Sequence, residues 1–183
     1  MIRTFVAAPL PEVVRAALGE LAQQLAAHSQ GVRWVRPENI HLTLRFLGDT
    51  DPEQVPALSK GLDEIAAPQP PFPMRLGGVG AFPNWKRPRV VWVGLEEEGE
   101  QLQKLRRAVE RLARSLRWER ETQEFKPHLT LGRVREGRSI SQGEWAVPPL
   151  DFPIDRVELI ESRLKPTGPE YHTLHQAVLG LSH

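Results

Sequence analysis

The tetrapeptide HLTL occurs twice, at residues 41–44 within IHLTLRFLG and at residues 128–131 within HLTLGRV. Apolar and polar residues alternate in both copies, which is typical of a half-buried strand. On a strand, His41 and Thr43 share one face while the leucines share the other, and His128 and Thr130 repeat this arrangement. Each copy therefore anchors two leucines in a core and presents an imidazole beside a hydroxyl on the open side.

The repetition carries more information than either copy. One histidine on a strand means little, and each copy alone reads as an ordinary amphipathic strand. At ordinary residue frequencies, however, a given four-residue match elsewhere in such a chain is on the order of a one-in-a-hundred event or rarer. The repeat indicates two half-chains of similar design that face one another. The alternative is that the repeat is left from an ancestral duplication and has no role in function.

Hydrophobic periodicity extends this picture along the chain. Strands are expected at residues 2–8, 31–35, 40–48, 128–134, 156–164 and 171–179, with a hairpin over residues 72–95 and a polar segment at residues 135–145. Helices are expected at residues 11–28, 52–65 and 99–117. The order lacks the regular alternation of a parallel doubly wound sheet, so we predict an α+β fold with antiparallel sheets.

Composition limits the domain organisation and the classes of function. A chain of 183 residues holds one sizeable core or two small lobes packed as a unit, so residues 1–183 are predicted to form a single domain. The absence of cysteine excludes disulfides, thiolate metal sites and a cysteine nucleophile. A net charge of +1 leaves room for a local site that binds one or two phosphates, but not for a grip on long duplex DNA.

Localisation follows by default. No apolar run has the length of a spanning helix, and prolines interrupt the N-terminal segment before it could form a signal-peptide core. We therefore expect a cytoplasmic protein with no membrane association.

If both strands border one cleft, the two imidazoles predict acid and base catalysis. Their ordinary pKa of about 6.5 lets one ring accept a proton while the other donates one at neutral pH. In-line displacement at phosphorus needs such a pair, because a water enters along one axis while an alkoxide leaves along the other. Threonine hydroxyls and an arginine would hold the equatorial oxygens.

In these motifs the chain resembles the 2H phosphoesterases, and in particular their RNA 2',3'-cyclic phosphodiesterase branch, also called 2'-5' RNA ligase-like proteins. The resemblance is carried by FVAAPLP, RWVRPENIHLTLRFLGD, RVVWVGL, FKPHLTLGRV and ELIESRLKPTGPEYHTL. It implies a bilobal fold of two interleaved lobes, with pseudo-twofold related halves flanked by helices around a central cleft. It also implies hydrolysis of 2',3'-cyclic phosphate ends of RNA or short oligonucleotides to 2'-phosphates, by a monomer without a metal or other cofactor, with reversible 2'-5' ligation as a side activity.

Carried over residue by residue, the resemblance implies that His41 and His128 are the catalytic pair. Thr43 and Thr130 would bind the phosphate. The first histidine would be the acid that protonates the departing ribose O3', and the second the base that activates water.

The residues five positions after each histidine differ, with Phe46 in the first copy and Arg133 in the second. The family pattern places an aromatic and a basic residue there, which implies that Arg133 lies near the phosphate and Phe46 against a base. Strict alternation instead points both toward the core. A twist, bulge or strand end after Gly132 would redirect Arg133, so we keep it as a phosphate ligand, whereas core packing is the preferred interpretation of Phe46 and base stacking the alternative.

Several other side chains have both an ordinary and a functional interpretation. Arg45 is either a substrate contact or an exposed strand arginine. The arginines within residues 106–117 are interpreted as a solvated helix face, because Glu110 lies between them in the sequence. His172 and His175 are expected to be ordinary surface or packing histidines. Candidates for base stacking, or for core packing, are Trp34, Phe82, Trp85 and Trp145, and a modest basic patch near them comprises Lys86, Arg87 and Arg89.

Three alternatives stay open at this stage. The substrate could be another cyclic phosphate, such as that of a nucleotide or an ADP-ribose derivative, because the motifs address phosphate geometry. The histidines could be ligands of a catalytic metal, although two histidines without paired carboxylates make a thin ligand set. The chain could also be a non-catalytic module that binds RNA ends.

Overall fold

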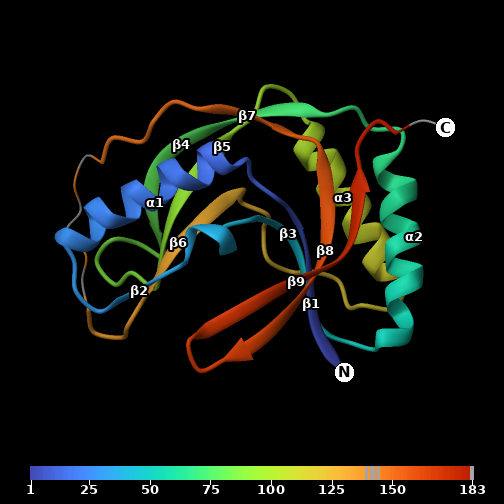
Figure 1. Ribbon diagram of the computed structural model, residues 1–183, viewed down its shortest axis with the longest axis horizontal. Coiled ribbons are helices and arrows are strands. Elements are labelled where there is room, and N and C mark those ends of the chain that lie inside the picture. The colour runs from blue at the N-terminus through green and yellow to red at the C-terminus, as the bar shows by residue number, and fades with distance from the viewer. Residues whose placement is uncertain (139, 141–142, 144, 182–183) are drawn as a thin grey trace.

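The computed structural model describes residues 1–138, 140, 143 and 145–181, and Figure 1 shows its elements. The strands are β1 (Ile2–Ala8), β2 (Val32–Trp34), β3 (Leu42–Thr50), β4 (Phe72–Phe82), β5 (Val90–Glu96), β6 (His128–Val134), β7 (Asp151–Ile154), β8 (Arg156–Lys165) and β9 (Gly168–Val178). The helices are α1 (Glu12–Ala27), α2 (Val55–Ala66) and α3 (Gln101–Ser115), with short 3₁₀ turns at Pro37–Asn39 and Pro52–Gln54.

The strands form two antiparallel sheets, and each sheet carries one copy of the repeated motif. The order is β3-β1-β8-β9 in the four-stranded sheet and β2-β6-β5-β4-β7 in the five-stranded sheet. The halves interleave, because β2 from the N-terminal half joins the five-stranded sheet while β8 and β9 from the C-terminal half join β1. The predicted α+β class with two antiparallel sheets is confirmed.

The helices cover both sheets. In Figure 1, α1 lies beside the five-stranded sheet, while α2 and α3 lie together on the side of the four-stranded sheet. The periodicity that predicted the third helix is confirmed by its buried residues, Leu102, Leu105, Val109 and Ala113. On its other side Arg107, Arg111 and Arg114 are exposed, whereas Arg106 is half-buried over the ring of Phe125.

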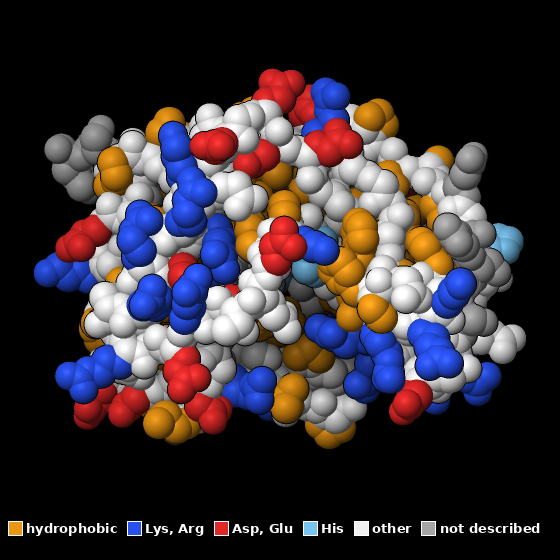
Figure 2. Space-filling view, turned by 180° about the vertical axis from the view of Figure 1, so that it is seen from behind, with side chains coloured by type: hydrophobic (Ala, Val, Ile, Leu, Met, Phe, Trp, Pro, Cys, Tyr) orange, Lys and Arg blue, Asp and Glu red, His pale blue; other side chains and the backbone are white. Residues whose placement is uncertain are grey.

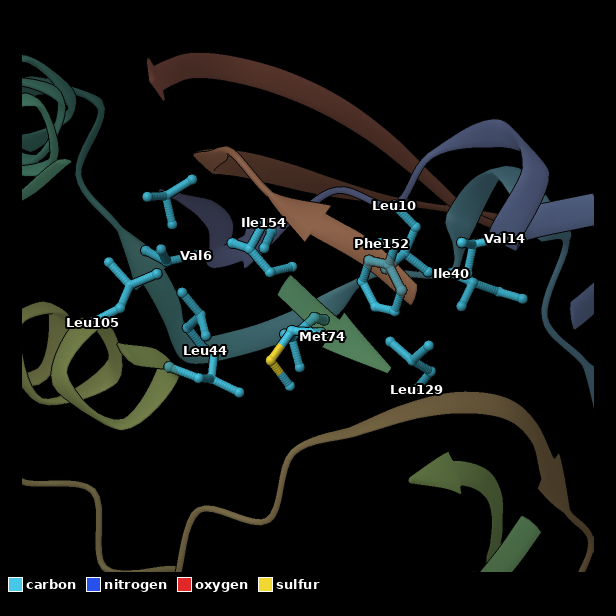
Figure 3. Packing of buried hydrophobic residues seen from close by; sticks show 14 of the residues in the cluster. Val6, Leu10, Val14, Ile40, Leu44, Met74, Leu105, Leu129, Phe152 and Ile154 are labelled. Carbon is cyan, nitrogen blue, oxygen red and sulfur yellow. The ribbon is translucent and has the colours of Figure 1, made fainter. Parts of the chain in front are cut away.

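One hydrophobic core joins the two sheets. The motif leucines contribute from both sides, since Leu42 and Leu44 of β3 belong to the same buried cluster as Leu129 and Leu131 of β6. Figure 3 shows Leu44 and Leu129 on either side of Met74 within this cluster. The leucine half of each motif therefore fixes the two strands to a shared interior, which leaves the histidine half on the opposite face.

Two strands differ from the sequence prediction. β7 was not predicted, because DFPI is short and contains a proline; it pairs with β4 at the edge of its sheet, where a missing backbone N–H is tolerated. β9 begins at Gly168, because the segment after Lys165 turns tightly and resumes pairing with β8. The polar segment predicted at residues 135–145 includes residues 139, 141, 142 and 144, which lie outside the described residues.

None of the helices in the described part of the chain combines the length and the apolar character that a membrane span requires.

Candidate active site

A cavity of about 1040 Å³ is lined by side chains from both sheets. It is bordered by the six candidate residues of the two motifs and the positions after them, namely His41, Thr43, Phe46, His128, Thr130 and Arg133. In Figure 2, histidine side chains are visible in a hollow near the middle of the face shown. The structure thus brings the two motifs, which lie on different sheets, to one solvent-accessible space.

The two histidines are held by the same contact. His41 Nδ1 lies 2.8 Å from the carbonyl oxygen of Asn39, and His128 Nδ1 lies 2.6 Å from that of Lys126. In each case the carbonyl belongs to the residue two positions earlier. Because a carbonyl only accepts hydrogen bonds, Nδ1 carries the proton and the neutral ring keeps Nε2 free to accept another. Both imidazoles are therefore oriented and fixed in the tautomer that suits proton transfer at Nε2.

The surroundings of the two rings differ. His41 meets the rings of Phe5 and Tyr171 edge to face, with centroid distances of 6.2 and 5.6 Å. Burial in this aromatic environment lowers the pKa of His41, although its bond to the Asn39 carbonyl acts in the opposite direction. His128 instead meets the edge of Phe82 at 5.1 Å. Desolvation thus biases the His41 imidazole toward its neutral form.

A β-bulge occurs at the same position in both motifs. The pairing of β3 with β1 skips Leu44, and the pairing of β6 with β5 skips Leu131, so each bulged residue is the last leucine of HLTL. An extra residue in one strand reverses the alternation of side chains beyond it. The bulges therefore decide where the residues after each HLTL point.

The side chains five positions after the histidines turn to the cavity as a result. Phe46 is 62% exposed and borders the cavity, so the preferred prediction that it packs in the core is wrong. Arg133 is also exposed and borders the cavity, and the bulge at Leu131 is the redirecting feature that the sequence left open. Strict alternation failed in both copies for the same local reason.

Arg45 belongs to a buried ion pair, which neither sequence interpretation anticipated. Its Nε donates to Glu110 Oε2 at 2.6 Å, and the two side chains are only 8% and 13% exposed. Its other nitrogens donate to the carbonyls of Phe46 and Glu119. Glu110 also accepts from the Glu121 N–H at 3.0 Å, so this cluster connects β3, α3 and the segment that leads into β6. Glu110 therefore does not interleave the exposed arginines of α3, as the sequence had suggested.

Two aromatic residues of the site, Phe5 and Tyr171, were missed by sequence reasoning. Phe5 stands on β1 and Tyr171 on β9, and their rings meet at 5.0 Å beside His41. The Tyr171 hydroxyl is half-buried, which raises its pKa, while the charge of Arg133 acts in the opposite direction. An isolated aromatic on a strand gives no local sign of this role, because its position depends on strand pairing across the sheet.

The remaining candidates divide between the cavity and other places. Trp34 and Phe82 border the cavity, whereas Trp85 and Trp145 pack against the core. His172 and His175 pair with the carboxylates of Glu170 and Asp63, at 2.6 and 2.8 Å.

Of the predicted basic patch, Arg89 pairs with Glu136, and Lys86 and Arg87 do not border the cavity. Within residues 1–138, 140, 143 and 145–181, no group of three or more His, Cys, Asp or Glu side chains is placed to hold a metal ion.

These features define a two-lobed α+β protein in which paired HxT motifs, one from each sheet, share a single cavity. A family model described as LigT like Phosphoesterase matches the chain twice, over residues 8–92 and 93–171. The chain belongs to this family. The two matches divide the chain much as the two motifs do, with one motif in each.

Relatives and solved structures agree with this assignment. The chain is 38% identical to the RNA 2',3'-cyclic phosphodiesterase of Archaeoglobus fulgidus, over 94% of this chain and 98% of the relative. The crystal structure of TT0787 of Thermus thermophilus is similar with a TM-score of 0.84 and 33% identity, covering all of both chains. Escherichia coli LigT complexed with 3'-AMP is similar with a TM-score of 0.77 and 26% identity, over 97% of this chain and 98% of that one.

Proposed function

We propose that this protein hydrolyses 2',3'-cyclic phosphate ends of RNA or short oligonucleotides and leaves a 2'-phosphate. The observation that carries the proposal is the pair of histidines that border one cavity with Nδ1 tied to a carbonyl and Nε2 free. The names of the relatives support it, as does the complex of LigT with 3'-AMP, a nucleoside that bears phosphate on its ribose.

The reaction proceeds by in-line attack on phosphorus. Nε2 of His128 takes a proton from water as the water oxygen bonds to phosphorus. The bond between phosphorus and O3' breaks on the opposite side, and Nε2 of His41 gives its proton to O3'. The phosphoryl group stays on O2', and proton exchange with solvent restores both rings.

The hydroxyls and the arginine stabilise the charge that builds on phosphorus. Thr43 and Thr130 accompany the histidines on the cavity face of each motif and donate hydrogen bonds to the non-bridging oxygens. Arg133 supplies a permanent positive charge and a planar pair of donors. The phosphate anion also favours the protonated form of His41, which offsets the desolvation that lowers the pKa of this ring in the free protein.

Turnover of an oligonucleotide with a 2',3'-cyclic phosphate, with EDTA present, tests these roles. His41→Ala and His128→Ala should each lower kcat by about 10² to 10⁴ while thermal unfolding stays close to wild type, because both side chains face the cavity. His172→Ala, which removes a histidine outside the cavity, is the matched control. Wild-type rates in either cavity variant would refute the assignment.

The same assay separates the alternatives. Phosphorus NMR of the product distinguishes a 2'-phosphate from a 3'-phosphate, and loss of turnover in EDTA would point to a metal enzyme. Cyclic nucleotides and a cyclic phosphate of ADP-ribose, offered in parallel, identify the preferred substrate class. Tight binding without turnover would indicate an RNA-end binding module. The cytoplasmic location, the monomeric state and the reverse ligation stay predictions.

A further inference from the structure

Arg33 and Arg133 stand directly opposite each other where β2 pairs with β6. Side chains at opposed positions of an antiparallel pair share a face, with Cβ atoms about 4.5 to 5.5 Å apart. Both arginines are exposed and both border the cavity. Like charges at opposed positions destabilise a sheet, so repulsion between the two guanidinium groups lowers the stability of this strand pair. A bound anion would remove this repulsion.

The chain's own carboxylates do not neutralise this pair. Among the residues that the structure describes, no ion pair involves Arg33 or Arg133. Other arginines of the protein are paired, including Arg45 with Glu110 and Arg89 with Glu136. The two guanidinium groups therefore face the cavity as a site for ligand anions.

The two arginines lie on different strands, β2 at the edge of the sheet and β6 next to it. Arg133 follows the second HxT motif on β6, and its charge acts on the Tyr171 hydroxyl, which lies beside His41. Arg33 stands on β2, the edge strand, one strand further from the middle of the sheet. Adjacent strands are about 4.8 Å apart, so Arg33 is displaced outward from the reacting phosphate by about one strand.

Close packing against β6 holds the backbone at Arg33. A Cβ at Gly132 would come within 2.8 Å of Val32 and 2.9 Å of Trp34, the residues on either side of Arg33. Only glycine lets β2 approach β6 this closely at that point. Arg33 is therefore presented from a firmly seated strand, which suits recognition of one group at a defined distance.

We propose that Arg33 binds the phosphate on O5' of the terminal nucleotide, while the cyclic phosphate of the same ribose occupies the HxT motifs and Arg133. In an RNA, this second phosphate is the diester that connects the terminal nucleotide to the rest of the strand. The inference rests on the proposed function and deepens it, because it makes RNA ends better substrates than free cyclic mononucleotides. The planar guanidinium is suited to bind two phosphate oxygens at once.

The test compares adenosine 2',3'-cyclic phosphate with the same compound bearing a 5'-phosphate, which differ only in the group that Arg33 would bind. The wild-type protein should prefer the 5'-phosphorylated compound in kcat/KM by about tenfold or more, as for a hydrogen bond to a charged group. Arg33→Gln should abolish most of this preference, and Arg33→Lys should keep part of it. Arg107→Gln, an exposed arginine of α3 outside the cavity, should keep both the preference and the rates.

Two outcomes would overturn the proposal. Equal losses on both compounds in Arg33→Gln would place Arg33 at the reacting phosphate, and an unchanged preference would remove it from phosphate binding. Calorimetric binding of adenosine 2',5'-bisphosphate and adenosine 2'-monophosphate measures the same preference without turnover. Failure of the proposed function, with no hydrolysis of either cyclic compound, is thereby distinguished from failure of the Arg33 site.

Discussion

Replacing Glu110 by leucine should destabilise the protein, because the buried Arg45 guanidinium loses its close counterion and keeps only the Glu121 carboxylate, which is 4.0 Å away and 30% exposed. The pair is separated by 2.6 Å, with side chains 8% and 13% exposed, so the solvent screens it little. Breaking a buried pair by removing one partner typically costs about 3 to 5 kcal/mol. The carbonyls of Phe46 and Glu119 still accept hydrogen bonds from Arg45 in this variant. We therefore expect Glu110→Leu to lower the free energy of unfolding by about 3 kcal/mol, at the lower end of this range.

The effect should depend on pH in a defined direction. Burial by itself disfavours the Glu110 carboxylate, but hydrogen bonds from the Glu121 N–H and Arg45 outweigh it and hold the pKa of Glu110 below its ordinary value of 4.5. A carboxyl whose pKa is lower in the folded state contributes stability above the unfolded pKa and loses it as the pH falls through the folded one. The difference between wild type and Glu110→Leu should be complete at neutral pH and shrink below pH 4.5.

Urea unfolding of Arg45→Met, Glu110→Leu and the double variant measures the coupling. The double variant should lose less stability than the sum of the single variants, because it leaves no unpaired charge. Asp151→Asn is the matched control, since its pair with Arg75 has the same 2.6 Å separation but is more than half exposed. The control should change stability much less. A loss below about 1 kcal/mol in Glu110→Leu, or additive single effects, would refute the reasoning.

Two further predictions concern the cavity. The descending limb of kcat/KM against pH, which reports loss of the proton from His41 in the free protein, should lie below pH 6.5 because burial lowers the pKa of this ring. In the pH profile of kcat the descending limb should lie at higher pH, since bound phosphate favours the imidazolium form of His41. A descending limb above pH 7 in kcat/KM would contradict the role of His41 as the acid. Phe46→Ala should leave unfolding within about 0.5 kcal/mol of wild type but raise KM for a purine substrate about fivefold or more, if a base stacks on the exposed ring. Leu44→Ala, at the buried bulge, should instead cost about 2 to 5 kcal/mol, and equal destabilisation by the two variants would restore the core interpretation of Phe46.

The sequence by itself predicted the secondary structure around the motifs and the histidine and threonine of each motif that border the cavity. Alternation in HLTL placed the leucines in a core and the histidines on the open face, and both placements hold because they depend only on the geometry of a single strand. The helical stripe of α3 was equally readable. These features come from local periodicity, which the chain carries whatever its partners are.

Tertiary structure alone decided what lies beyond each HLTL. The bulges at Leu44 and Leu131 arise in the pairing of β3 with β1 and of β6 with β5, and they turn Phe46 and Arg133 to the cavity. The partner of Arg45 on α3, the rings around His41 and the opposition of Arg33 to Arg133 depend likewise on segments far apart in sequence. A strand's own alternation predicts a side chain's direction only as far as its register with the neighbouring strand stays regular, and that register is a property of the assembled sheet.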